Sequence, residues 1–202
     1  MLKAPKFWYQ NKISIFAILL LPISLLWIIG TLLKKKFAKP IRSKVPVIAV
    51  GSAIIGGSGK TPSVIYVCEI LEKIGYKPHI ISRGYGGSAN EVIKVSPDMN
   101  YSLVGDEAIM MSKYYPTWVS KNKYSAFSMA EKDGANILVL DDALQSYNVF
   151  KNLNIYVYDS IQSFGNKLIV PSGPLRESIN GVLNRSQIVF LVNTDNCPEI
   201  SQ

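Results

Sequence analysis

Apolar and polar positions between residues 46 and 202 form two kinds of segment. Short runs that are almost wholly apolar, such as VIAV at 47–50 and ILVL at 137–140, are typical of strands covered on both faces of a sheet. Longer segments of mixed polarity lie between them and predict helices. We expect strands at 47–50, 79–82, 91–95, 117–120, 137–140, 155–158 and 187–192, and helices at 60–74, 106–115 and 124–132. This alternation predicts an α/β fold with a mostly parallel sheet and helices on both faces.

Residues 13–33 form a separate apolar run, ISIFAILLLPISLLWIIGTLL, which contains no charged residue. A run of about 20 apolar residues matches the thickness of a bilayer core. Pro22 and Gly30 are tolerated in membrane helices, and the aromatic residues at 7–9 suit the membrane interface. We therefore expect a membrane anchor helix, either spanning or re-entrant. A cleaved signal peptide and a buried core helix remain alternatives, although three lysines follow the run where a cleavage site would need small residues.

The formal net charge of +8 belongs to the N-terminal part of the chain. Residues 1–44 hold nine Lys or Arg and no Asp or Glu, and the first acidic residue is Glu69. Basic residues that flank an apolar run favour anionic lipid headgroups over nucleic acid. Six of the nine follow the run, so the positive-inside bias places the rest of the chain in the cytoplasm. The expected organisation is a basic arm at 1–12, the anchor at 13–33, a basic linker at 34–45 and an enzymatic domain at 46–202.

A glycine-rich turn lies between the expected strand at 47–50 and the helix that begins at Lys60, in the segment VPVIAVGSAIIGGSGKTP. Glycines let backbone N–H groups close around phosphate oxygens, and the helix N-terminus adds positive dipole. Lys60 would reach the β- and γ-phosphates, and the Thr61 hydroxyl would hold Mg²⁺. The strict pattern has a glycine at position 54, which is Ile here. We expect nucleotide phosphates to be bound by Gly56, Gly57, Ser58, Gly59, Lys60 and Thr61.

Two acidic clusters follow the glycine-rich turn. The segment ANILVLDDALQ places Asp141 and Asp142 at the end of a buried strand, as in a Walker B segment, where a carboxylate holds Mg²⁺ directly or through water. Asp106 and Glu107 follow Gly105 at a loop-to-helix junction, where Asp most often caps the helix. Capping and chemistry are compatible at this place, because the capped end of the helix points into the expected site.

Five motifs occur in order along the chain: GGSGKTP, SRGYGG, VGDE, LDDALQ and FGNKLIVPSGPLRE. As an ordered set they resemble the tetraacyldisaccharide 4'-kinase (lipid A 4'-kinase) family, which uses ATP and Mg²⁺ to phosphorylate the 4'-position of the lipid A disaccharide precursor. The resemblance runs from the apolar run to about Asn193. It implies a fold like that of P-loop NTPases, the lipid A disaccharide precursor and inner-membrane lipids as partners, and the cytoplasmic face of the bacterial inner membrane as the location.

The resemblance also implies roles for individual residues. Lys60 and Thr61 match the P-loop lysine and the Mg²⁺-binding threonine, and Lys60 would act in catalysis. Asp106 matches the catalytic base toward the 4'-hydroxyl. Asp141 and Asp142 match the acidic pair that holds Mg²⁺. The residues implied at the border of the substrate cleft are Arg83, Tyr85, Glu107 and Arg176.

Some positions depart from the family pattern. Ser52 stands where the family has Asn, and Ala143 and Ser146 stand where it has Gly and His. The family continues into a C-terminal lobe whose His pairs with the catalytic Asp. We expect this chain to be truncated before that lobe and to show little 4'-kinase activity alone. A non-catalytic remnant that binds nucleotide and membrane, and a different membrane-attached P-loop ATPase, remain alternatives.

Overall fold

The computed structural model describes residues 4–10 and 12–193, a range that holds every predicted site residue; Cys197 lies outside it. The chain forms two compact units. The sheet unit comprises Lys39–Gly51 and Lys60–Ile155. The terminal unit comprises the residues up to Ala38, Ser52–Gly59, and the residues from Tyr156 onwards. The chain therefore passes from one unit to the other at both ends of the glycine-rich turn, between Gly51 and Ser52 and between Gly59 and Lys60.

The sheet unit is built on strands in the order β3-β4-β2-β5-β1. Their bounds are β1 (Val47–Gly51), β2 (Pro78–Ser82), β3 (Ile93–Val95), β4 (Thr117–Val119) and β5 (Ile137–Leu140). The pairs β1–β5, β5–β2 and β2–β4 are parallel, and β3 is antiparallel to β4. Every residue of β1, β2, β4 and β5 is buried, as the continuous apolar runs of β1 and β5 indicate. The predicted α/β fold with a mostly parallel sheet is confirmed.

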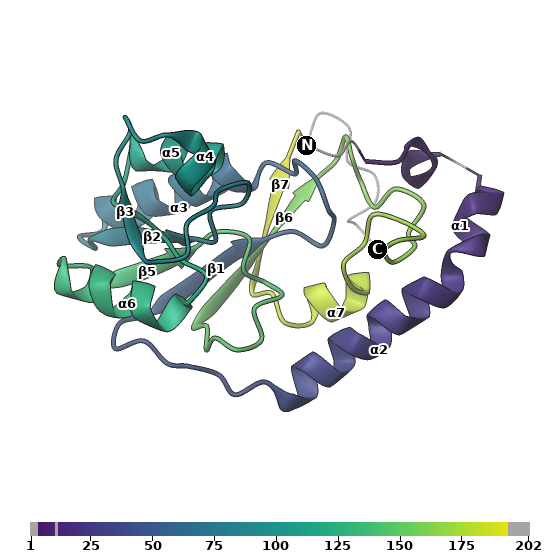
Figure 1. Ribbon diagram of the computed structural model, residues 1–202, viewed down its shortest axis with the longest axis horizontal. Helices are drawn as coiled ribbons and strands as arrows, with labels where there is room; N and C mark the ends of the chain where they lie inside the picture. Colours follow the sequence, from purple (N-terminus) through teal and green to yellow (C-terminus); the bar gives the residue numbers. More distant parts are fainter. Residues whose placement is uncertain (1–3, 11, 194–202) are drawn as a thin grey trace. The chain divides into compact units, whose positions relative to one another are not determined.

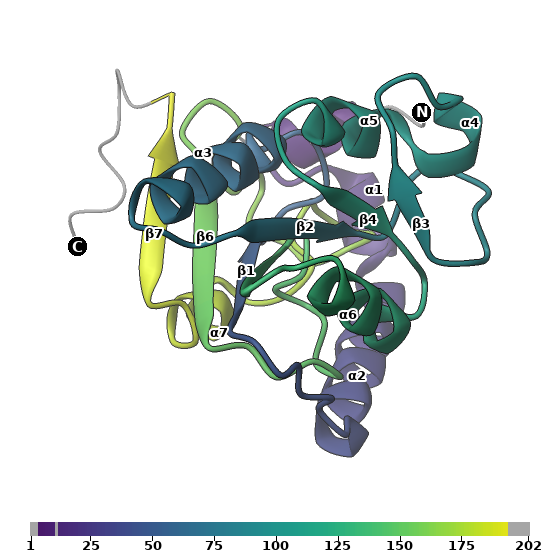
Figure 2. The same cartoon turned by 90° about the vertical axis from the view of Figure 1, so that its left-hand side faces the viewer.

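Helices cover both faces of this sheet. Figure 2 shows α3 and α5 on one side of β2 and β4, and α6 on the other. The helices of the unit are α3 (Lys60–Lys73), α4 (Tyr101–Val104), α5 (Asp106–Ser112) and α6 (Lys123–Lys132). The Asn122 side chain caps α6 by accepting the N–H groups of Tyr124 and Ser125. The sequence analysis did not predict α4, which is a single turn and too short to show helical periodicity.

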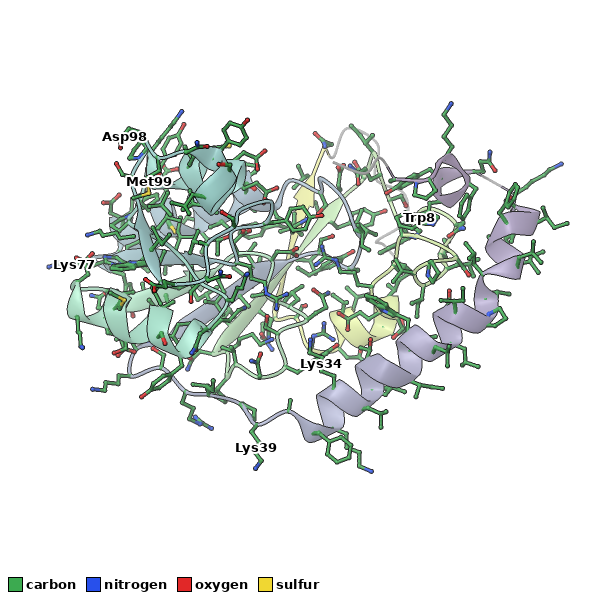
Figure 3. The ribbon with its side chains drawn as sticks, viewed as in Figure 1. Trp8, Lys34, Lys39, Lys77, Asp98 and Met99 are labelled. Atoms are coloured by element: carbon green, nitrogen blue, oxygen red, sulfur yellow. The ribbon has the colours of Figure 1, made fainter. Side chains whose placement is uncertain are left out.

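The terminal unit combines both ends of the described chain. It contains η1 (Lys6–Tyr9), α1 (Ile15–Leu19), α2 (Leu21–Phe37), α7 (Ile179–Leu183), β7 (Ile188–Val192), and the end of β6 (Leu153–Asp159), which begins in the sheet unit. Ser160 N donates to Val192 O at 3.1 Å, so the ends of β6 and β7 lie side by side. The buried Trp8 donates its indole N–H to Pro171 O at 2.9 Å (Figure 3). This bond ties η1 to the C-terminal part of the unit.

The apolar run at 13–33 forms two helices instead of the expected single one. Figure 1 shows α1 and α2 as separate purple segments, which meet at Leu20. Pro22 explains the break, because its ring carries no N–H and clashes with the carbonyl four residues earlier. Leu20 O instead accepts the N–H groups of Ile23 and Ser24, each at 3.0 Å. The predicted anchor helix over residues 13–33 is therefore present as two helices.

A helix that crosses a membrane must be both long and apolar. Across residues 4–10 and 12–193, none of the helices combines the length and the apolar character that crossing a membrane requires. The α2 helix contains the apolar residues after the break at Leu20, but its last turn is occupied by Lys34, Lys35 and Lys36. The expected membrane-spanning helix is therefore not supported by the structure.

The α1 and α2 helices bury small residues and expose large apolar ones. Their large apolar side chains face outward, with Phe16 64% and Leu26 68% exposed, whereas the buried residues are the small Ala17 and Ser24. Soluble helices normally bury the large apolar residues and expose the polar ones. The two helices therefore present a continuous apolar surface, which we call the apolar face. Its large exposed residues are Ile15, Phe16, Ile18, Leu19, Leu21, Ile23, Leu25, Leu26, Trp27, Ile29, Leu32, Leu33 and Phe37.

Candidate active site

The glycine-rich turn occupies Ser52–Gly59 and lies in the terminal unit. Gly56 and Gly59 have φ angles of +129° and +70°, which side-chain-bearing residues rarely adopt. The Gln162 side chain donates from Nε2 to Gly57 O at 2.5 Å and so holds the turn from outside. The predicted strand, glycine-rich turn and helix are all present in this order.

The helix that follows the turn begins at Lys60, the predicted phosphate-binding lysine. Lys60 and Thr61 are both buried. Buried lysines are usually paired with charged groups, and Lys60 interacts electrostatically with Glu107 and Asp141. The first backbone N–H groups of α3 have no carbonyl four residues earlier within the helix, and its dipole is positive at this end. The N-terminus of a helix of this length, with a lysine at its first position, has the chemistry of an anion site.

Asp141 follows β5 and is only 4% exposed. Ser82, at the end of the neighbouring strand β2, donates its hydroxyl to Asp141 Oδ2 at 3.0 Å. The other carboxylate oxygen, Oδ1, is buried and accepts no hydrogen bond from the described residues. Burial raises the pKa of Asp141 to about 6, and the charges of Asp142 and Glu107 add to this rise.

Asp142 lies next to Asp141 with a φ of 45°, in the left-handed region that residues other than glycine seldom adopt. The segment that follows it is held by two lysines. Lys151 Nζ donates to the carbonyl oxygens of Ala143 and Leu144 at 3.3 and 3.0 Å. Lys123 Nζ donates to the Ser146 hydroxyl at 2.7 Å. These bonds support the strained turn in which the acidic pair sits.

Lys123 is the most strongly perturbed cation of the sheet unit among those that the structure describes. It lies at the first position of α6 and is buried. Burial lowers its pKa to about 7; nearby Arg83 and Lys151 lower it as well, and Asp141 and Asp142 oppose the shift. A buried lysine with this environment is a functional candidate, and the sequence analysis missed it.

Asp106 and Glu107 begin α5, and Gly105 occupies the N-cap position. Both acidic side chains are exposed, and Asp106 Oδ1 accepts the Glu107 N–H at 3.0 Å. Desolvation raises the pKa of Glu107, Asp106 and Asp142 add to the rise, and Lys60 opposes it. The interpretation of Asp106 as the N-cap is shifted by one residue, and its carboxylate stays accessible to a substrate.

The SRGYGG motif packs against the segment before α5. Ser88 N and Ala89 N donate to Ser102 O and Leu103 O, each at 3.0 Å. A Cβ on Gly105, whose φ is +86°, would overlap the carbonyl oxygen of Tyr85. Glycine is therefore required where these two motifs meet. Arg83 and Tyr85 reach the surface of the sheet unit from this loop, and both are exposed.

Five of the predicted residues lie close enough in the sheet unit to influence one another's charge. They are Lys60, Asp106, Glu107, Asp141 and Asp142. Arg176 and the glycines of the turn belong to the terminal unit. The structure thus brings the P-loop lysine, the proposed base and the acidic pair together from three separate motifs, at the start of α3, the end of β5 and the start of α5.

The residues present suit a divalent cation such as Mg²⁺. Asp141 Oδ1 is a buried oxygen that lacks a donor among the described residues, and its raised pKa shows that the ionised form needs a counter-charge. Within residues 4–10 and 12–193, no three His, Cys, Asp or Glu side chains gather as a self-sufficient metal site. Mg²⁺ is usually held by one or two carboxylates together with phosphate and water oxygens, so this donor set fits.

Ser82, Lys123 and Lys151 are residues of this site that the sequence analysis did not identify. The location of Ser82 could have been inferred, because the ends of neighbouring parallel strands meet at one edge of a sheet and Ile81 pairs with Leu140. The two lysines carry no sequence signal of this kind. Their amines reach the 143–146 segment only through the folding of α6 and of the loop before β6.

Comparison with known proteins places this geometry in a family. The family model described as LpxK, tetraacyldisaccharide-1-P 4'-kinase, matches residues 16–202. A tetraacyldisaccharide 4'-kinase from Jannaschia sp. is 36% identical over 195 residues, and one from Rhodospirillum rubrum is 37% identical over 197 residues. Each alignment covers 96% of this chain, but 59% and 58% of the respective relative. The chain therefore spans about three fifths of the length of these curated relatives.

A solved structure shows the same likeness. The crystal structure of LpxK from Aquifex aeolicus in complex with ATP matches with a TM-score of 0.78 and 28% identity, over 91% of this chain and 61% of that chain. The family model covers nearly the whole sequence. The chain belongs to the tetraacyldisaccharide-1-P 4'-kinase family.

Proposed function

We propose that this chain carries the nucleotide site of an ATP-dependent kinase that phosphorylates the 4'-hydroxyl of the tetraacyldisaccharide 1-phosphate precursor of lipid A. One observation carries the proposal: the buried Lys60, at a helix N-terminus, lies within electrostatic range of the exposed Glu107 and of the buried Asp141, whose Oδ1 accepts no hydrogen bond from the described residues. Phosphoryl transfer depends mainly on positioning and charge neutralisation, and these are the groups it needs.

Each residue has a distinct part in this proposal. Lys60 and the first N–H groups of α3 bind the phosphates of ATP. Thr61, Asp141 and Asp142 would hold Mg²⁺, which neutralises phosphate charge when it is bound. Asp106 is accessible at the start of α5 and accepts the proton of the sugar hydroxyl. Glu107 lies beside Asp106, and its pKa is raised mainly by desolvation, with a further contribution from the charge of Asp106.

The Lys60→Ala variant tests nucleotide binding. We expect it to weaken Mg-ATP binding by about 1.5–3 kcal/mol, because a charge-assisted contact to phosphate is lost. Isothermal titration calorimetry measures the change. Lys73→Ala is the matched control, since Lys73 lies on the same helix, is exposed and pairs only at the surface with Glu69. Equal ATP affinities for wild type and Lys60→Ala would reject the assignment. Binding without any transfer to the disaccharide would instead favour the non-catalytic alternative.

We also propose that the apolar face of α1 and α2 lies against the cytoplasmic surface of the bacterial inner membrane. Its exposed residues cover two helices, whereas apolar residues on an ordinary protein surface are scattered singly. Exposed apolar patches of this kind mark interaction sites. Lys34, Lys35 and Lys36 at the end of α2 supply the cations that anionic headgroups attract. A lipid occupant fits this combination of apolar area and basic rim, and it would present an acylated substrate to the enzyme.

Vesicle sedimentation tests the membrane proposal. The double variant Phe16→Glu/Leu26→Glu should lose most of its binding to vesicles of anionic phospholipid, because two carboxylates would enter the headgroup–acyl boundary. Ile74→Glu is the control, an exposed apolar residue in the sheet unit. Unchanged sedimentation of the double variant, or an equal loss in the control, would contradict a lipid-facing role for α1 and α2.

A further inference from the structure

The α2 helix makes polar contacts with one particular segment of the terminal unit, residues 169–176. Ser24 is 4% exposed, and its hydroxyl donates to Ile169 O and lies 2.8 Å from the Ser172 hydroxyl. Ser172 N donates back to the Ser24 hydroxyl at 3.2 Å. One turn further along α2, Trp27 Nε1 donates to Arg176 O at 3.1 Å. Two side chains of α2 thus hold both ends of the 169–176 segment.

The same segment is paired with the glycine-rich turn. Ile55 N donates to Pro174 O at 2.9 Å, and Arg176 N donates to Ala53 O at 2.7 Å. Ile54 and Leu175 form the antiparallel bridge between these two bonds. The start of the turn therefore has a short strand-like partner. Ala53–Ile55 is the stretch that leads directly into Gly56 and Gly57.

Arg176 is the link between the two sets of contacts. Its backbone N–H binds the turn at Ala53, and its backbone carbonyl accepts the indole N–H of Trp27. Trp27 is 47% exposed and lies among the outward-facing residues of the apolar face. Burial therefore does not force its indole N–H to find a partner within the protein. The burial of a serine rather than a large apolar residue at position 24 also favours a specific polar contact over simple packing.

We propose that Ser24 and Trp27 are positioning residues for the ATP phosphates, which act through the 169–176 segment on the glycine-rich turn. The inference rests on the proposed function, since it assigns phosphate binding to the turn. Backbone N–H groups bind phosphate well only when their direction is held in advance. A turn rich in glycine has little stiffness of its own, so its geometry depends on the segment paired with it.

The Trp27→Phe variant tests this proposal in the otherwise intact chain. It keeps an aromatic ring on the apolar face and removes only the N–H donor. We expect the dissociation constant for Mg-ATP to rise about 3- to 10-fold, which is the effect of one lost hydrogen bond. Ser24→Ala should produce a rise of similar direction. Leu183→Met is the control, because Leu183 is an exposed apolar residue of α7 in the same unit and lies outside the apolar face.

Hydrogen exchange distinguishes a positioning role of Trp27 from a general effect on stability. The amides of Ile55 and Arg176 should exchange faster in Trp27→Phe than in Leu183→Met, while amides of the β5 strand keep their protection. A lower melting temperature with unchanged ATP affinity and unchanged exchange at these two amides would overturn the proposal. If Ser24→Ala does not fold, the Trp27→Phe comparison still decides.

The two proposals can fail separately. If Lys60→Ala abolishes ATP binding while Trp27→Phe changes neither affinity nor exchange, the positioning role is wrong and the nucleotide site stands. If the wild-type chain binds no ATP, the proposed function fails and so does the role assigned to Ser24 and Trp27.

Discussion

Asp106→Asn should lower the rate of phosphoryl transfer to the disaccharide about 10²–10⁴-fold while leaving ATP affinity unchanged. The amide keeps the shape of the carboxylate but cannot accept the proton of the 4'-hydroxyl, and general base catalysis contributes this range. Asp106 is exposed at the start of α5, so its loss leaves no buried group without a partner. The effect should therefore appear in turnover and not in stability.

A labelled-ATP assay with the tetraacyldisaccharide 1-phosphate in detergent micelles measures this loss, and calorimetry measures ATP binding. Asp98→Asn is the control, because Asp98 is an exposed carboxylate of the same unit that accepts a hydrogen bond from the nearby Ser96 hydroxyl. Turnover that survives in Asp106→Asn would show that the carboxylate serves only the helix end, where it accepts the Glu107 N–H.

Asp141→Asn should abolish transfer and at the same time stabilise the nucleotide-free protein. The wild-type carboxylate is ionised at neutral pH although burial raises its pKa to about 6, so the fold carries a poorly solvated charge. A shift of this size corresponds to on the order of 1–3 kcal/mol of stability. For a chain of this length the melting temperature should rise by several degrees, since about 1 kcal/mol moves it by 2–4 °C.

The pH dependence of stability gives this prediction its sign. Because the pKa of Asp141 is higher in the folded state than its ordinary value of 3.8, the folded state binds the proton more tightly. Its contribution to stability is present at low pH and is lost as the pH rises from about 4 to about 6. Thermal unfolding without Mg²⁺ or nucleotide should show this loss in the wild type and not in Asp141→Asn.

Ser82→Ala makes a matched comparison for Asp141→Asn. The Ser82 hydroxyl donates to Asp141 Oδ2 and lowers the pKa of that carboxyl, so its removal should destabilise the protein at neutral pH and raise the pKa further. Opposite shifts of the melting temperature in the two variants would confirm that desolvation dominates. A less stable Asp141→Asn, with the difference constant across pH, would mean that the carboxylate is a stabilising hydrogen-bond acceptor instead.

The Asp106→Asn and Asp141→Asn variants separate an effect on catalysis from an effect on folding stability at two positions of one site. Asp106 is exposed and is expected to matter only when substrate is bound. Asp141 is buried and is expected to reduce the stability of the free protein. The backbone of this site is strained as well, since Asp142 adopts a φ of 45°.

The sequence by itself determined the main elements and most of the site. The strand ILVL was predicted at 137–140 and is β5 with the same bounds, because an uninterrupted apolar run of that length has few other solutions. Lys60 starts α3 as expected, since the GKT sequence and its glycines constrain the local backbone. Local motifs predict Asp106, Asp141 and Asp142 as site residues. In the structure Asp141 and Glu107 lie within electrostatic range of Lys60, and Asp106 and Asp142 lie within range of Glu107.

The N-terminal run differs from its sequence-based prediction at Pro22, a residue that a membrane helix tolerates. In the structure the missing N–H and the clash of the ring separate α1 from α2 at Leu20. Hydropathy reports the length of an apolar run, and it does not report whether the backbone within that run stays in one helix.

Only the tertiary structure decided which distant side chains support the chemistry. Ser82 and Asp141 are 59 residues apart, and Trp27 and Arg176 are 149 apart. No periodicity or motif relates positions at such separations, because each side chain is placed by a different strand, helix or loop. The free oxygen of Asp141 and the exposure of the large residues of α2 follow from the same cause. Burial is a property of what packs around a residue, which the local sequence does not contain.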